Sequence, residues 1–94
     1  MLRIWKLPLN WRRLEENNFL VSGYVIKILD IQEQKGEFVA WVLFDESPNF
    51  EEKINIKGFF TGKPITANPD YLVYIKTLQI GDLVWHFFHD RFNG

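Results

Sequence analysis

The chain has 94 residues, no cysteine and a formal net charge of −1. This length predicts a single domain over residues 1–94 with one hydrophobic core. The missing cysteine excludes a disulfide framework, a thiolate nucleophile and a thiolate zinc site. A charge so close to zero argues against a basic nucleic-acid binder and against a strongly acidic DNA mimic, so we expect no direct sequence-specific contact with nucleic acid.

Runs of β-branched and aromatic residues alternate with Gly, Pro and Asn turn signals along the whole chain. This pattern is typical of antiparallel strands joined by short turns, and it shows no βαβ alternation. The one helical candidate is 10–17, where Asn10 is a suitable N-cap. We therefore expect an all-β fold, an antiparallel sandwich or partly open small barrel of about six strands with at most one short helix. The predicted strands are 2–7, 20–33, 37–45, 52–60, 72–79 and 83–89.

The predicted strand around 38–44 is apolar on both faces. Successive strand residues point to opposite faces, so one face carries Phe38, Ala40, Val42 and Phe44, and the other carries Val39, Trp41 and Leu43. A small antiparallel domain has few elements with which to cover both faces of such a strand. We therefore expect a homo-oligomer in which a second copy covers one of them.

Aromatic residues are unusually frequent, with four Trp, three Tyr and nine Phe. Each ring buries ~150–250 Å², and a domain of this size lacks the interior for all of them. Two interpretations stay open: an exposed aromatic cluster with a function, or the general preference of strands for aromatic residues. Two interpretations also stay open for the amino-terminal residues Trp5, Trp11, Arg12 and Arg13. Their composition is typical of an interface, but they also suit packing over the end of a sandwich.

The segments ILDIQEQKGEF, AWVLFD, FFTGKPI and YIKTLQIGDLVWHFF follow one another within residues 24–89. In this order they resemble a family of small phage-encoded proteins of unknown function, with a Gln-rich hairpin, a Thr-Gly-x-Pro-Ile turn and a Leu-Val-Trp-His closing strand. Residues 1–23 match loosely, and Lys63 stands where the family pattern has histidine. The resemblance implies a small β-rich phage protein and transfers no activity. The matching residues are Gln32, Gln34, Gly36, Trp41, Asp45, Thr61, Gly62, Pro64, Ile65, Tyr74, Ile75, Thr77, Gln79, Gly81, Leu83, Val84, Trp85 and His86.

Catalytic patterns are missing from the sequence. Ser22 and Ser47 stand in no nucleophile-elbow context. His86 and His89 are three residues apart on a predicted strand, so they point to opposite faces and do not chelate one metal ion. We expect no enzyme activity, no catalytic residue, no metal site and no cofactor.

The best candidate site is the turn Thr61-Gly62-Lys63-Pro64, where successive N–H groups and the Lys63 charge suit an anion; a plain hairpin turn explains the same residues. The Gln amides suit base edges or a partner backbone, or simply a solvent-facing strand. His86 lies between apolar neighbours, a place more typical of a hydrogen-bonded structural histidine. The candidate ligand-binding residues are Gln32, Gln34, Trp41, Thr61, Gly62, Lys63, Tyr74, Gln79, Trp85 and His86.

These features suggest a non-enzymatic phage counter-defence protein in the cytoplasm of the host cell. No apolar run approaches the ~20 residues of a membrane helix and no signal-peptide pattern opens the chain, so we expect no membrane partner. The leading hypothesis is an oligomer that sequesters a small nucleotide immune signal, with Lys63 and its turn on the phosphate and Trp41, Trp85 or Tyr74 stacked on the base. The alternatives are a protein–protein inhibitor of a host defence enzyme, such as a CRISPR effector, and a minor virion protein.

Overall fold

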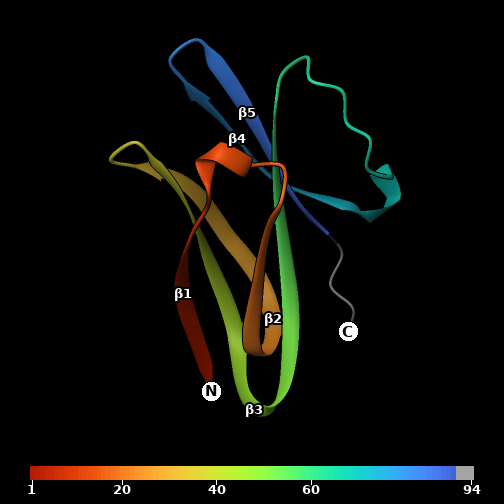
Figure 1. Cartoon of the computed structure of the whole chain (residues 1–94). Coiled ribbons are helices and arrows are strands. Elements are labelled where there is room, and N and C mark those ends of the chain that lie inside the picture. The colour runs from red at the N-terminus through yellow and green to blue at the C-terminus, as the bar shows by residue number, and fades with distance from the viewer. Residues whose placement is uncertain (91–94) are drawn as a thin grey trace.

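A computed structural model describes residues 1–90 and, within them, every side chain except that of Trp11. Five antiparallel strands form one open sheet, and two 3-10 turns interrupt the connections (Figure 1). The elements are β1 (Leu2–Pro8), η1 (Trp11–Arg13), β2 (Asn17–Gln34), β3 (Glu37–Phe60), η2 (Pro69–Tyr71), β4 (Leu72–Ile80) and β5 (Leu83–Asp90). The predicted all-β antiparallel class is confirmed.

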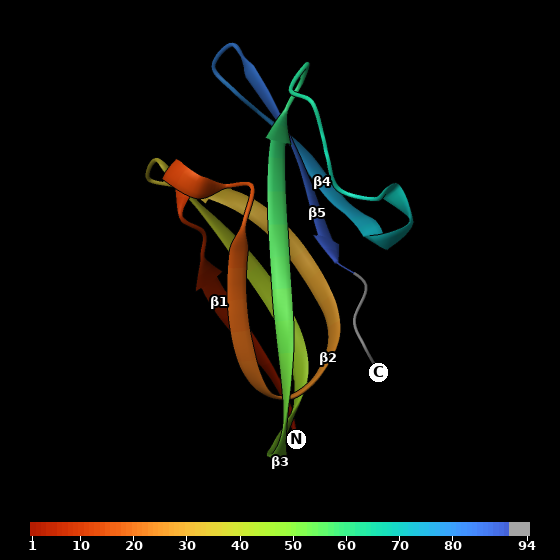
Figure 2. The same cartoon turned by 45° about the vertical axis from the view of Figure 1, so that its right-hand side comes forward.

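Strands β2 and β3 form one long hairpin that is bent in half. Its tip is the two-residue turn Lys35-Gly36, where both residues have positive φ, 52° and 83°. This is the turn geometry whose twist matches that of the flanking strands. Near the middle, the pairing jumps from Ser22–Glu51 to Gly23–Glu46, so residues 47–50 bulge out of the ladder. The hairpin doubles back at this point, at the lower end of the molecule in Figure 2.

Gly23 stands at the corner of the bent hairpin. Its φ is +146°, and a Cβ built there would lie 2.1 Å from the backbone oxygen of Asp45. Only glycine allows the two strands to approach this closely at the bend. Immediately beyond the corner, the rings of Tyr24 and Phe50 stack with centroids 4.2 Å apart and connect the two sides of the bend.

The bend divides the sheet into two layers. The first layer contains β1, residues 37–46 of β3 and residues 24–34 of β2; the second contains residues 17–22 of β2, residues 51–60 of β3, β5 and β4. Apolar side chains from the facing sides of both layers make a single core. The largest fully buried side chains are Phe44, Phe87, Ile31, Ile54, Ile56, Val21 and Val42.

The structure has five strands where about six were predicted, and β2 begins at Asn17, three residues before the predicted start at 20. The strands predicted at 37–45 and 52–60 are the two arms of β3, because Ser47-Pro48-Asn49 bends an extended chain and does not end the strand. The predicted helix over 10–17 is reduced to the 3-10 turn η1, capped as expected by the Asn10 side chain, which accepts a hydrogen bond from the Arg12 N–H at 3.1 Å.

Two bulges in β2 set the direction of its side chains. Register shifts fall between Val25 and Lys27 and between Ile28 and Asp30. As a result Val25, Ile28 and Ile31 are buried, whereas Ile26 and Leu29 are 53% and 42% exposed. The mostly apolar segment 25–31 therefore faces the core at every third residue, and the residues in between lie on the outer side.

Candidate functional site

A pocket of about 300 Å³ opens at the end of the second layer where η1 crosses β3. We call it the rim pocket. The segment after η1 is held there by a hydrogen bond from the Gly58 N–H to the Leu14 carbonyl, 2.6 Å long. Glycine is needed at position 58, because a Cβ there would lie 2.8 Å from the Phe87 ring and 3.4 Å from the Cβ of Leu14 in the crossing segment. The lining residues are Arg12, Arg13, Leu14, Glu15, Glu16, Lys63 and Trp85.

The rim pocket combines positive charge with an aromatic ring. Its lining has three cationic and two carboxylate side chains. Lys63 forms an ion pair with Glu15, and its Nζ also lies 5.6 Å from the centre of the Phe60 ring. The half-buried Trp85 indole packs edge-on against Phe60 with centroids 5.6 Å apart and contacts Phe38 at 6.2 Å. These neighbours fix the position of the Trp85 ring at the pocket.

The turn at 61–64 does not present a row of free N–H groups. The Thr61 N–H donates to the Val84 carbonyl at 3.0 Å, and the Lys63 N–H donates to the Phe60 carbonyl at 3.1 Å. Pro64 has no N–H. The predicted binding of an anion by successive turn N–H groups is therefore not supported at Thr61 or Lys63, and Lys63 contributes through its side chain.

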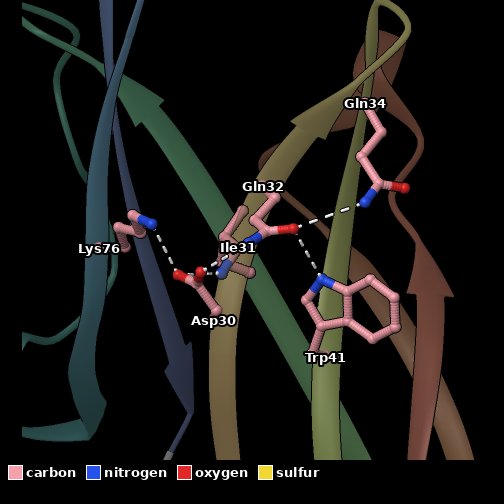
Figure 3. A network of polar contacts seen from close by, with 6 residues as sticks. All are labelled: Asp30, Ile31, Gln32, Gln34, Trp41 and Lys76. Carbon is pink, nitrogen blue, oxygen red and sulfur yellow. Dashed lines mark hydrogen bonds and ion pairs between the residues drawn. The ribbon is translucent and has the colours of Figure 1, made fainter.

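Gln32, Gln34 and Trp41 form a second group, on the outer face of the first layer (Figure 3). The Gln32 Oε1 accepts hydrogen bonds from the Trp41 Nε1 at 3.2 Å and from the Gln34 Nε2 at 3.5 Å. Its Nε2 in turn donates to the Asp30 Oδ2 at 3.1 Å. Much of the hydrogen-bonding capacity that we assigned to a ligand is thus used within the protein.

Asp30 connects this group to the second layer. The Lys76 Nζ donates to the Asp30 Oδ1 at 2.8 Å, and Figure 3 shows this ion pair bridging the space between β2 and β4. The Lys76 hydrogen bond lowers the pKa of the Asp30 carboxyl below its usual value. Partial burial opposes this shift, and the Ile31 N–H supports it. The pair holds together two strands that share no ladder in the described sheet.

Thr61, His86 and Tyr74 belong to a third group, on the outer face of the second layer. His86 shares hydrogen bonds with the Thr61 hydroxyl at 2.8 Å and the Thr77 hydroxyl at 3.0 Å. The Thr77 oxygen also pairs with the Tyr74 hydroxyl at 2.7 Å. We call these four residues the polar chain. His86 is half-buried and hydrogen-bonded through both ring nitrogens, as a structural histidine is.

A family model described as a domain of unknown function, DUF7352, matches residues 1–93. The chain belongs to this family. The match includes residues 1–23, so the family's domain takes in β1 and η1 together with the hairpins. No curated protein and no solved structure shows a significant match.

Within this family member, the ten candidate residues divide among separate places. The rim pocket takes Lys63 and Trp85, the first-layer face takes Gln32, Gln34 and Trp41, and the polar chain takes Thr61, Tyr74 and His86. The other two lie in or beside turns: Gly62 has a φ of +93°, and the Gln79 amide donates to the carbonyl of Gly81 at 3.4 Å.

Arg12 and Arg13 are pocket residues that the sequence analysis noted only as part of an interface-like composition. No local signal connects them to Lys63 or Trp85, which lie more than 45 residues further along the chain. Residues 1–90 contain no group of three His, Asp or Glu side chains placed to hold a metal ion. None of the helical segments in that range is long and apolar enough to cross a membrane.

Proposed function

We propose that this protein is a non-enzymatic binding module that holds a small nucleotide in the rim pocket. The observation that carries the proposal is the meeting of Lys63, Arg13 and the Trp85 indole around one pocket of about 300 Å³. Cationic side chains bind phosphate through charge-assisted hydrogen bonds, and an indole stacks on a base. The volume lies at the lower end of the ~300–1,000 Å³ range of small-molecule sites.

The proposal places the phosphate near Lys63 and the base on Trp85. Trp85 replaces the wider set of stacking candidates, because Trp41 and Tyr74 belong to the first-layer face and the polar chain. A larger depression of about 660 Å³ is lined by Lys6, Pro8, Gln34, Lys35, Glu37 and Val39. That depression lacks an aromatic ring among its described lining residues, so it suits a nucleotide less well.

Glu15 gives the proposal a specific electrostatic consequence. Its carboxylate is the ion-pair partner of Lys63 and lines the same pocket. A phosphate that binds Lys63 competes with this carboxylate, because like charges at one cation repel. Glu15 therefore limits the affinity for an anion, and removing its charge should raise that affinity.

The resemblance to phage-encoded proteins supports a biological role for such a site. A binding module that holds a nucleotide signal without converting it lowers the free concentration of that signal in the infected cell. This is the counter-defence role that we propose. It requires that bound nucleotides are recovered unchanged.

The direct experiment is to release bound small molecules from the purified protein by heat and identify them by mass spectrometry. Calorimetry against cyclic and NAD-derived nucleotides then measures affinity. We expect Lys63→Ala to weaken binding about tenfold, with a smaller effect at high salt because the lost interaction is screened. Glu15→Gln should tighten binding, Trp85→Ala should weaken it at every salt concentration, and Lys53→Ala, an exposed lysine on β3, is the control.

Absence of binding to every nucleotide would contradict the proposal and favour the alternative, a protein–protein inhibitor. Conversion of any nucleotide would overturn its non-enzymatic part. Weaker binding by the Glu15→Gln variant would show that Lys63 does not contact the phosphate.

A further inference from the structure

β1 is an edge strand with one open side. It pairs with β3 along its other side, from Leu2–Asp45 to Pro8–Val39, and no further strand of the described sheet pairs with it (Figure 1). The ladder of β1 has no register shift, whereas the ladders of the other two edge strands, β2 and β4, contain bulges. Bulges protect a sheet edge from pairing with another chain, so β1 is the edge best suited to accept a further strand.

Two hydrogen bonds show which backbone groups of β1 face the open side. The Glu46 N–H donates to the Met1 carbonyl, and the Leu9 N–H donates to the Phe38 carbonyl, both at 2.9 Å. Hydrogen-bonded pairs alternate with non-hydrogen-bonded pairs along an antiparallel ladder, so the odd-numbered residues of β1 bond to β3. The even-numbered residues direct both an N–H and a C=O group to the open side, and these residues are Leu2, Ile4 and Lys6.

The sequence of β1 agrees with this alternation. Pro8 has no N–H to donate, and it occupies an even-numbered position, where an N–H would face away from β3. The exposed apolar side chains of the strand lie along the same edge, since Leu2 is 62% exposed, Ile4 59% and Trp5 40%. An edge with free backbone groups and exposed apolar side chains is a template for pairing with another strand.

We propose that β1 of a second copy of this chain pairs with this edge in antiparallel orientation, so that the two first layers form one continuous sheet. In the proposed register, Ile4 lies opposite Ile4 of the second copy, and Leu2 lies opposite its Lys6. Each free N–H and C=O group of these residues then has a partner. A register shifted by one residue sets free groups opposite groups already bonded to β3, and a shift by two either sets Leu2 opposite Pro8 or leaves Lys6 unpaired.

The charges of β1 favour the same register. Arg3 and Lys6 are its cationic residues, and the one-residue shift would set them opposite each other. In the proposed register Arg3 lies opposite Trp5 of the second copy, and a guanidinium stacks well on an indole. The Arg3 Nε pairs with the Glu46 Oε2 at 2.6 Å, and this ion pair uses the edge of the guanidinium and leaves its flat face available to the ring.

A second copy fits this edge better than a disordered peptide does. β3 already holds β1 in an extended conformation, so pairing orders little additional backbone, whereas a disordered segment loses conformational entropy when it binds. The arrangement is isologous, because the same residues lie on both sides of the two-fold axis. It is independent of the rim pocket, to whose described lining β1 contributes no residue.

Sedimentation velocity of the full chain at tens of micromolar tests the proposal. We expect a species of twice the chain mass, and a dissociation constant at least tenfold higher for Ile4→Pro. Proline at position 4 removes an N–H that faces the open side and leaves the hydrogen bonds to β3 in place. Ile4→Val is the matched control, since it keeps the N–H and a β-branched apolar side chain. A monomeric parent protein, or an Ile4→Pro variant that dimerises as well as Ile4→Val, would overturn the proposal.

Amide hydrogen exchange of the parent protein tests the backbone pattern without a substitution. The Ile4 and Lys6 amides should exchange at least tenfold more slowly at high protein concentration than at low concentration, because the second copy protects them. The Trp5 and Leu7 amides bond to β3 and should be protected at both concentrations. Unchanged exchange at Ile4 when the dimer forms would overturn the pairing of the two β1 strands.

Disulfide cross-linking tests the register, because the chain has no cysteine of its own. Ile4→Cys sets two thiols opposite each other with Cα atoms about 5.5 Å apart, which is within the range of a disulfide. Lys6→Cys sets its two thiols four residues apart along the strands, at about 14 Å, so it should not cross-link. Cross-linking of Lys6→Cys, or none of Ile4→Cys, would overturn the register.

Discussion

The two layers of the sheet share one core but have different outer faces. The first layer exposes Ile4, Ile26 and Leu29, with Trp41 and Leu43 half-buried between them. The second layer has the polar chain, in which hydroxyl and imidazole groups satisfy one another, and the Lys57–Asp90 ion pair at 3.4 Å. Its most exposed aliphatic side chain, Leu20, pairs with Lys53 in the ladder. Most of the exposed apolar area on the two outer faces described here therefore lies on the first layer, whereas the polar groups of the second layer pair with one another.

The largest expected effect is a loss of stability on substitution at the inner face of the first layer, which should exceed the loss at the outer face. Phe44 is fully buried, so Phe44→Ala should lower the free energy of unfolding by about 3–5 kcal/mol. Trp41, on the opposite face of the same strand, is half-buried, and Trp41→Ala should cost about 1–2 kcal/mol. Denaturant unfolding at a concentration low enough to exclude a dimer measures both. Equal costs would contradict the assignment of Trp41 to the outer face.

The next effect concerns the corner that creates the two layers. Gly23→Ala places a Cβ against the Asp45 carbonyl in a positive-φ conformation, and it should cost about 3 kcal/mol. Gly62 has a φ of +93° and nothing within 4 Å of a built Cβ, so Gly62→Ala reports backbone strain alone. Thermal unfolding compares the two variants. A similar cost for both would show that the close approach at the bend adds little.

The smallest effect tests the ion pair between the layers. Because the pKa of Asp30 is lowered in the folded state, the pair stabilises the protein above the unfolded value of ~3.9, and this contribution is lost as the pH falls through the lowered pKa. Both side chains are about one-third exposed, so Asp30→Asn should cost only about 0.5 kcal/mol at neutral pH.

Urea unfolding of the parent and the Asp30→Asn variant across the acidic range measures this difference. It should shrink to nothing at strongly acidic pH, where the carboxyl of the parent is protonated. Asp82→Asn, in the exposed β4–β5 turn, is the control. A difference that stays constant with pH would show that the Asp30 side chain stabilises the fold through its shape and not through its charge.

The amino-acid sequence by itself determined the antiparallel all-β class, the positions of β1, β4 and β5, and the two faces of the closing strand, but it divided β3 into two strands. Alternation and turn chemistry act between near neighbours. The strands predicted at 20–33 and 37–45 leave only residues 34–36 for the hairpin tip, where Lys35-Gly36 lies, and the burial of Phe87 next to the half-exposed His86 and Phe88 agrees with period-two spacing.

Only the tertiary structure decided how these pieces meet. The bend at Gly23, the two bulges of β2 and the ion pair between Asp30 and Lys76 depend on residues that are up to 46 positions apart. The rim pocket has the same origin, since η1 reaches Lys63 and Trp85 only after the long hairpin has folded back. Contacts of this kind form only because the sheet folds into two layers, and no local pattern along the chain specifies that layering.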